Sequence, residues 1–172
     1  MFRGSASYVA MTYDYNLLVE AKVARAGRAR AALTPVLDAA GVNALLQKAF
    51  PGAPPAAFPT VTEVSPGRVK VFTPHREGLL RPGGVISGPT LMSLADTAAY
   101  ALVLAHIGEQ LMAVTSSLTM NFLRGAQPGD IRAEAEMLRL GRRNAVCDVR
   151  LWTESADRLA AQATVTYAIP PS

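Results

Sequence analysis

Four stretches in the second half of the chain alternate between apolar and polar side chains with a period of two residues. They cover residues 114–123, 131–137, 145–152 and 159–167. Successive side chains of a β-strand point to opposite faces, so each stretch predicts a strand with one apolar face. Turn-forming residues separate the stretches at 127–130, 141–144 and 154–157. The pattern therefore predicts an antiparallel meander whose apolar face needs a single cover.

The sequence also predicts a hairpin upstream of these strands and an irregularity within one of them. Residues 60–64 and 68–73 share the same period and flank the turn sequence Ser65-Pro66-Gly67, which predicts a hairpin. Met137 and Leu138 are adjacent apolar residues, so the alternation slips by one position there. Such a slip predicts a β-bulge near the end of that strand.

The stretch 89–105 is the only helix-forming segment that is apolar enough to cover the sheet. The predicted fold class is therefore α+β, with one antiparallel sheet wrapped around one long central helix. Thr34-Pro35 predicts the start of a shorter helix that ends at Pro51. The apolar face of this helix is predicted to consist of Val36, Leu37, Ala40, Ala44, Leu45 and Ala49. At 172 residues the chain is most simply one domain, 34–172, behind an N-terminal extension, 1–33, in which 16–32 could be helical.

The composition limits the classes of partner. No group of His, Cys, Asp and Glu has metal-ligand spacing, and no glycine-rich loop fits a dinucleotide or phosphate-binding motif. The formal charge of +4 comes without a nucleic-acid motif. No apolar run is long and charge-free enough to span a bilayer, and the N-terminus lacks a signal-peptide stretch. We therefore expect a cytoplasmic protein with no metal, nucleic-acid or membrane partner.

Three residues that could carry chemistry have simpler structural interpretations. Cys147 alternates with apolar neighbours and is expected in the core, without a base beside it. His106 closes the central helix, where a cation suits the helix dipole. His75 lies at the start of a long loop and is expected at the surface.

Asp96 is different, because it lies within the apolar central helix. It shares a stripe of that helix with Met92, Ala99, Tyr100 and Val103. A carboxylate there loses hydration and needs either a partner or a chemical role. Just upstream, the loop 83–89 ends at the start of the helix, where free backbone N–H groups can stabilise a developing negative charge. An acid near such donors predicts acyl chemistry.

Several motifs in this order and spacing support that prediction. They are Ser87-Gly88-Pro89 at the helix start, Asp96 two turns later, the strand 115–124, Gly129-Asp130, and Leu140-Gly141-Arg142-Arg143. Over residues 60–169 the chain resembles the hotdog-fold thioesterases of the phenylacetate-degradation (PaaI-like) type. The resemblance implies an acyl-CoA thioesterase without a cofactor, with coenzyme A as part of the substrate. It also implies at least a homodimer, and commonly a homotetramer.

The resemblance assigns roles to individual residues. Asp96 takes the place of the acid that activates water or attacks the thioester directly. The Gly88 N–H takes the place of the donor that polarises the thioester carbonyl, and Thr115 that of a hydroxyl that orients the water. Ser87 stands where the family usually has His, and Arg81 where related enzymes often have Asn, so both are candidate substrate contacts. Arginines suit the phosphates of coenzyme A, for which the candidates are Arg124, Arg142 and Arg143.

The spacing of Gly88 and Asp96 has a further consequence. Eight residues on one helix separate them by about 12 Å along its axis. One carbonyl group cannot contact both, so if both act on the same thioester they come from two subunits. The expected catalytic site therefore lies between subunits.

Two other functions stay open. One is a non-catalytic hotdog protein that binds acyl-CoA or a related acyl ligand, which the substitutions at Ser87 and Arg81 would allow. The other is a hotdog dehydratase acting on acyl thioesters. The dehydratase is disfavoured because that family relies on a histidine near the helix start, where this chain has Ser87.

Overall fold

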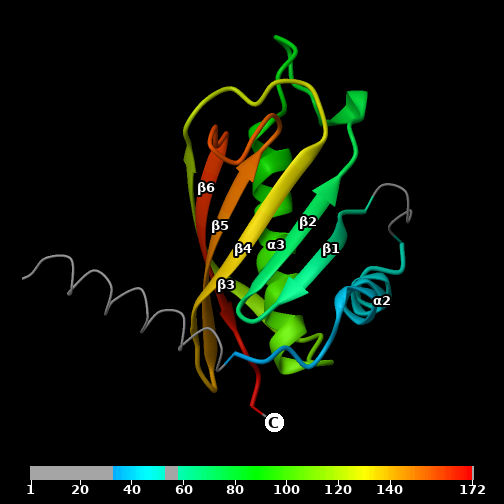
Figure 1. The fold of residues 1–172 in the computed structure, drawn as a ribbon, viewed down its shortest axis with the longest axis vertical. Helices are drawn as coiled ribbons and strands as arrows, with labels where there is room; N and C mark the ends of the chain where they lie inside the picture. Colours follow the sequence, from blue (N-terminus) through cyan, green and yellow to red (C-terminus); the bar gives the residue numbers. More distant parts are fainter. Residues whose placement is uncertain (1–32, 53–57, 172) are drawn as a thin grey trace, which may run out of the picture.

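The computed structural model describes residues 33–52 and 58–171, and its main element is one six-stranded antiparallel sheet. The strand order is β1-β2-β4-β5-β6-β3 (Figure 1). The predicted hairpin is confirmed, but the predicted meander holds only for β4, β5 and β6, because β3 pairs with β6 at the sheet edge and β4 pairs with β2. The strands are β1 (Thr60–Ser65), β2 (Arg68–Thr73), β3 (Val114–Phe122), β4 (Ile131–Leu140), β5 (Asn144–Trp152) and β6 (Ala161–Ala168).

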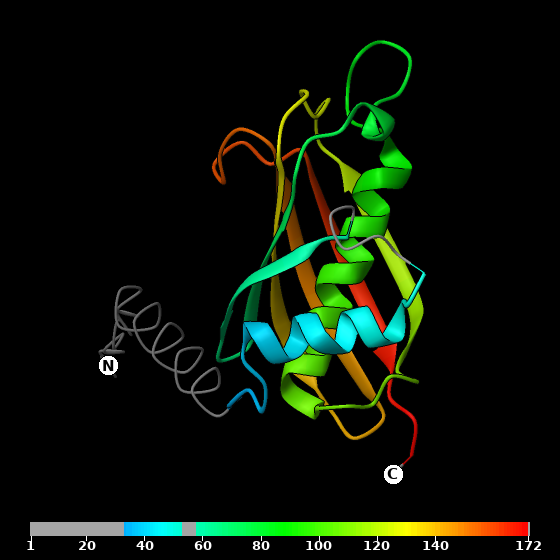
Figure 2. The same cartoon turned by 90° about the vertical axis from the view of Figure 1, so that its right-hand side faces the viewer.

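The sheet curves around the long helix α3 (Gly88–Ile107), which lies along its inner face (Figures 1 and 2). Most of α3 is buried, and the inward residues of the central strands are almost fully excluded from solvent. Alanines on α3 let the helix approach the sheet closely, and branched residues on β4, β5 and β6 fill the space between them. This α+β arrangement is the hotdog fold expected from the sequence.

Besides the shift between Val61 and Glu63 of β1, irregular pairing occurs at two places that bear on the predictions. The slip predicted beside Met137 is confirmed, because the β4–β5 register shifts between Met137 and Arg139. A second shift, between Thr115 and Ser117 of β3, was not predicted. It places Thr115 opposite the inward-facing Tyr167 of β6, whereas strict alternation put Thr115 on the other face from Leu118.

The shorter helix α2 (Ala39–Ala49) begins later than predicted. Its N-cap is Asp38, whose side chain accepts a hydrogen bond from the Gly41 N–H at 2.8 Å. Thr34-Pro35 starts no helix because the chain there runs along the end of α3, and the N–H groups of Val36 and Leu37 both donate to the Ala105 carbonyl. The predicted apolar face is confirmed in part, because Leu37, Leu45 and Ala49 pack against the core, whereas Ala40 and Ala44 are exposed. The most deeply buried residues of the helix, Val42 and Leu46, were not predicted.

Helix α2 packs across α3 near its C-terminal end and against β1 (Figure 2). Its Asn43 side chain forms two hydrogen bonds with the backbone of Val61, one to the carbonyl and one from the N–H, both at 2.9 Å. The helix thus covers part of an edge strand. The helix predicted over 16–32 lies outside the described residues.

The prediction that no segment could span a membrane needs correction. Helix α3 has 20 residues and is apolar enough, by length and composition, to cross a bilayer. In this fold 67% of its most apolar window is buried inside the protein. Burial within a protein core explains the same composition.

His106 lies in the last turn of α3 as predicted, but it is buried and its ring forms two hydrogen bonds. Its Nε2 accepts a hydrogen bond from the Gly67 N–H at 3.0 Å, and its Nδ1 lies 2.8 Å from the Leu102 carbonyl. An Nε2 that accepts leaves the proton on Nδ1, which donates to that carbonyl. The neutral ring therefore ties the β1–β2 turn to α3. Cys147 lies in the core as predicted, and burial raises the pKa of its thiol to about 12.

Candidate active site

Asp96 lies on the side of α3 that faces β3 and β6, and its carboxylate is half-buried. Thr115 Oγ1 donates a hydrogen bond to Asp96 Oδ1 at 2.6 Å. Tyr167 OH donates to the same oxygen at 2.8 Å. Among the described residues, these two hydroxyl groups are the hydrogen-bond donors to the carboxylate, and Oδ1 is the acceptor for both. Oδ2 is therefore the oxygen left to accept a proton from a water or to attack a carbonyl.

The two donors are held together by the sheet. Thr115 and Tyr167 are direct cross-strand partners in the β3–β6 ladder, next to the β3 bulge. Side chains directly opposite each other in an antiparallel pair lie close together. The bulge turns the Thr115 side chain inward, so both hydroxyl groups reach the one carboxylate that α3 presents to them.

Tyr167 was predicted only as a residue of the apolar strand face. Burial raises the pKa of its phenol, and the nearby Asp96 charge raises it further, so the hydroxyl stays a donor at neutral pH. The ring stacks on Tyr100, with centroids 5.6 Å apart. One signal could have identified it, because a tyrosine on a core face needs a partner for its hydroxyl. The sequence did not indicate which partner.

The Asp96 carboxylate opens onto a cavity of about 290 Å³, called here the Asp96 pocket. Thr115 and Tyr167 line it on the polar side, and Phe50, Tyr100 and Leu111 on the apolar side. The Tyr100 hydroxyl donates to the Leu111 carbonyl at 2.9 Å and does not contact Asp96. The pocket thus combines one carboxylate with aromatic walls, which suits an acyl group next to a reacting carbonyl.

The first turn of α3 explains the residue types at its start. Ser87 is the N-cap, and its Oγ accepts from the Thr90 N–H at 3.3 Å and lies 2.7 Å from Thr90 Oγ1. The Leu91 N–H donates to the Ser87 carbonyl, and Pro89 has no N–H to place. The side chain of Ser87, predicted as a substrate contact, is thus engaged in capping the helix.

The backbone N–H of Gly88 remains, and it has no hydrogen-bond acceptor among the residues that the structure describes. It lies at the positive end of the helix dipole, where a developing negative charge is stabilised. A Cβ at position 88 would lie 3.3 Å from the Phe122 ring, so glycine lets the backbone sit against that ring. Gly88 lines a second cavity of about 500 Å³, called here the Gly88 pocket, together with Arg81, Phe122 and Arg124.

Gly88 and Asp96 line separate cavities, although both belong to α3. Gly88 packs against Phe122 at the end of β3, and Asp96 is held by Thr115 at its beginning. The separation predicted from the spacing of the two residues is therefore present within one subunit.

The predicted arginines fall into two groups. Arg81 and Arg124 line the Gly88 pocket. Arg142 and Arg143 lie in the β4–β5 turn, at the other end of the sheet, because Asn144 pairs with Ala168 and Ala168 with Val114. No ion pair among the described residues joins Arg81 to Asp96. The described residues also contain no cluster of three or more His, Cys, Asp or Glu side chains able to hold a metal ion.

The chain is similar to known proteins both in sequence and in structure. The sequence profile of the thioesterase superfamily matches residues 83–167. A candidate esterase from Saccharolobus solfataricus is 31% identical over 110 residues, which are 63% of this chain and 76% of that protein. The structure of a candidate thioesterase from Silicibacter sp. has 37% identity and a TM-score of 0.73, covering 81% of this chain and 96% of its own. The phenylacetic acid degradation protein PaaI from Thermus thermophilus has 28% identity and a TM-score of 0.59, covering 67% and 96%.

Proposed function

Because the chain belongs to the thioesterase superfamily, we propose that it hydrolyses an acyl-CoA thioester to the free acid and coenzyme A. One observation carries the proposal. The Asp96 carboxylate is held through Oδ1 by two hydroxyl groups, with Oδ2 left over, beside an aromatic pocket. An acid fixed in this way at a cavity suits a general base or a nucleophile.

The free edge of β3 supports a site shared between two subunits. β3 is the last strand in the sheet order, and its outer edge is unpaired within the described chain. Apolar side chains are exposed along and beside it, namely Val114 (54%), Phe122 (54%) and Leu123 (53%). If two such edges pair in antiparallel fashion about a two-fold axis, the beginning of one β3 meets the end of the other. Asp96, near the beginning, then faces Gly88 of the partner subunit.

The proposed reaction uses these groups as follows. Asp96 Oδ2 takes a proton from a water held near the Thr115 hydroxyl, and the water oxygen attacks the thioester carbonyl carbon. Gly88 of the partner subunit donates its N–H to the carbonyl oxygen as negative charge develops there. The carbon–sulfur bond then breaks, and the coenzyme A thiolate takes up a proton as it leaves. Direct attack by Asp96, through an acyl-aspartyl intermediate that water hydrolyses, is the variant of this mechanism.

Replacing Asp96 by asparagine tests the proposal. Asp96→Asn keeps the size of the side chain but removes the base, so thiol release from an acyl-CoA panel should fall by at least about a hundredfold. Asp148→Asn is the matched control, because Asp148 lies on β5 and contacts Gln162 and Arg150 rather than the pocket. Equal turnover by Asp96→Asn and the wild type would contradict the assignment.

A second candidate function is binding of an acyl-CoA without hydrolysis. The observation that favours it is the set of side chains at the Gly88 pocket. That pocket holds an exposed arginine, Arg81, and the helix-start residue Ser87 serves as a cap. This alternative predicts saturable binding of acyl-CoA by calorimetry, with no thiol released by the wild type from any substrate of the panel.

A further inference from the structure

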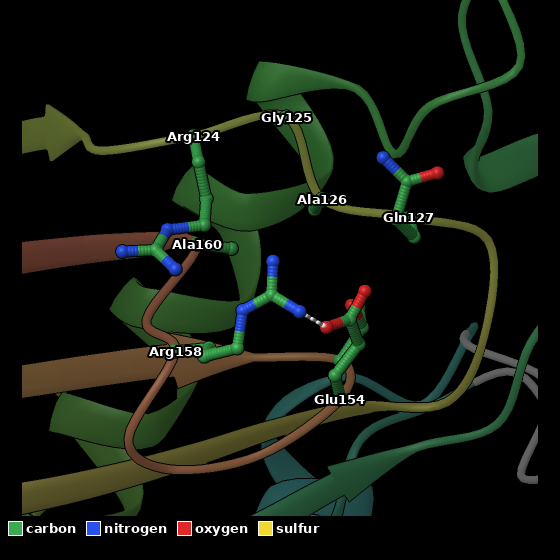
Figure 3. Close-up of a pocket in the computed structure, with 8 residues that line it drawn as sticks. Arg124, Gly125, Ala126, Gln127, Glu154, Arg158 and Ala160 are labelled. Atoms are coloured by element: carbon green, nitrogen blue, oxygen red, sulfur yellow. Dashed lines mark hydrogen bonds and ion pairs between the residues drawn. The ribbon is translucent and has the colours of Figure 1, made fainter.

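A third cavity, of about 420 Å³, adjoins the Gly88 pocket. It lies between the segment that follows β3 and the β5–β6 turn (Figure 3). Arg124, Gly125 and Ala126 line both cavities. The two therefore form one groove, which runs from the Gly88 N–H to Arg158. This outer part is called here the Arg158 pocket.

The Arg158 pocket has an excess of positive charge. Arg124 and Arg158 contribute two guanidinium groups, and Glu154 contributes the one carboxylate in its lining. Arg158 Nη1 pairs with Glu154 Oε2 at 2.6 Å, whereas no ion pair within the described chain involves Arg124. In Figure 3 Arg124 extends toward the turn that carries Arg158, and the Arg158 guanidinium stands between Arg124 and Glu154. Two cations with one acid suit an anionic ligand.

The Arg158–Glu154 pair does not prevent such binding. Both side chains are exposed, at 63% and 45%, and exposed ion pairs contribute little net stability. A phosphate can therefore replace or join Glu154 at little energetic cost. A guanidinium group matches the spacing of phosphate oxygens and donates two hydrogen bonds to them. Gln127 and Thr153 add neutral polar groups to the same lining.

We propose that the Arg158 pocket binds the phosphate groups of coenzyme A, on the subunit whose Gly88 N–H contacts the thioester. This inference rests on the proposed function. Coenzyme A separates its thioester from its phosphates by an uncharged arm, so the phosphate site must lie away from the carbonyl donor along a connected groove. The Gly88 and Arg158 pockets provide that connection through Gly125 and Ala126. Arg142 and Arg143 lie outside this groove, so we assign the phosphates to Arg124 and Arg158.

The kinetic test compares two substrates with the same acyl group. One is the acyl-CoA, and the other is the acyl N-acetylcysteamine thioester, which has no phosphate. Arg124→Ala and Arg158→Ala should each raise KM about tenfold for the acyl-CoA and leave it unchanged for the phosphate-free thioester. Glu154→Gln should lower KM for the acyl-CoA several-fold, because it removes a competing anion. The matched control is Arg150→Ala, for which no change is expected, because Arg150 pairs with Asp148 on β5 and lines neither pocket.

Calorimetry with free coenzyme A separates this inference from the proposed function. The phosphate site is supported if the wild-type protein binds coenzyme A and if Arg124→Ala and Arg158→Ala weaken this binding. This result counts even when no thioester is hydrolysed. The inference is overturned if these variants bind coenzyme A as well as the wild type. It is equally overturned if they lose activity equally toward both thioesters, or if a double variant at the other predicted arginines, Arg142→Ala/Arg143→Ala, is the one that loses affinity.

Discussion

The two oxygens of Asp96 have different surroundings, and this difference determines what the residue can do. Oδ1 accepts from Thr115 and Tyr167, which fixes the plane of the carboxylate. Hydrogen bonds to a charged acceptor are stronger than those between neutral groups, so each donor contributes to this orientation. A base that is oriented in advance loses less entropy when it takes a proton. In the mechanism that we propose, Tyr167 is thus a positioning residue, which acts through Asp96.

Replacing Tyr167 by phenylalanine should separate this positioning role from packing. Tyr167→Phe removes the hydroxyl but keeps the ring stacked on Tyr100, so we expect kcat to fall about tenfold with little change in KM. Tyr100→Phe is the control, because its hydroxyl bonds to the Leu111 carbonyl instead. Steady-state kinetics and a melting curve of both variants check the prediction. A fall in kcat of the same size in Tyr100→Phe would refute it.

Sequence reasoning identified some of these residues and missed others for a clear physical reason. Asp96 is identifiable because a charge in an apolar helix is costly, whatever the tertiary structure. Tyr167 is not, because its contact with Asp96 depends on the register between β3 and β6. Ser87 shows the converse case. Its position in the motif suggested a substrate contact, whereas its hydroxyl is the acceptor that the first turn of α3 requires.

At the scale of elements, α2 stabilises the sheet at the edge formed by β1. β1 is the edge strand, so backbone groups on its outer side have no ladder partner, and its register with β2 shifts between Val61 and Glu63. Asn43 supplies the missing partners for Val61, whose side chain is almost fully buried. The helix and the irregular strand therefore stabilise each other.

Removal of the Asn43 side chain should destabilise the fold measurably. Asn43→Ala leaves the Val61 N–H and carbonyl without their partner, which costs about 1–3 kcal/mol. In a chain of this size, each kcal/mol lowers Tm by roughly 2–4 °C. Gln47→Ala, one turn further along α2 at an exposed position, should leave Tm unchanged within error. Differential scanning calorimetry compares the two, and equal Tm values would argue against a role for this clamp.

The strands could be predicted from the sequence, whereas the start of α2 could not. Different interactions determine the two. Burial of one face of a strand requires apolar and polar side chains to alternate along it, and the sequences of the observed strands show this alternation. The start of α2 depends instead on a tertiary contact, since the Ala105 carbonyl holds Val36 and Leu37 away from a helical conformation. The bulge in β3 is a similar case. Its apolar pattern showed no slip, yet the bulge brings Thr115 to the inner face.

At the scale of the molecule, the single cysteine reports on the integrity of the core. Burial raises the pKa of Cys147 to about 12 from its usual value of 9.0. Above pH 9 the unfolded chain therefore loses a proton that the folded chain keeps. The stabilisation is complete below pH 9 and is lost as pH rises toward 12.

The measurement is urea unfolding at pH 8 and at pH 10.5, for the wild type and for Cys147→Ala. The variant lacks the titrating thiol, so its unfolding midpoint should fall less between the two pH values than that of the wild type. A thiol reagent added to the folded wild type at pH 8 should react only as fast as the protein unfolds. Equal midpoint shifts in both proteins would show that the thiol does not contribute.

At the scale of the molecule, the proposed site needs two subunits, because it combines Asp96 of one with the Gly88 N–H of the other. Within one subunit, the acid lies near the beginning of β3 and the free N–H near its end. Two variants remove these groups separately. Asp96→Asn removes the acid, and Gly88→Pro removes the N–H. Gly88→Ala is the control for the second, because it also places a Cβ against Phe122 but keeps the donor.

A heterodimer made from the two inactive variants distinguishes a shared site from an internal one. Copies with different tags are co-expressed, and dimers that carry both tags are purified. If each site combines Asp96 of one subunit with Gly88 of the other, one of the two sites in this heterodimer is intact and the other lacks both groups. Thiol release should then return to about half of the wild-type rate per dimer. If each site lies within one chain, neither is intact, because one chain lacks the acid and the other lacks the donor. The heterodimer would then be as inactive as its two parents, and the shared site would have to be abandoned.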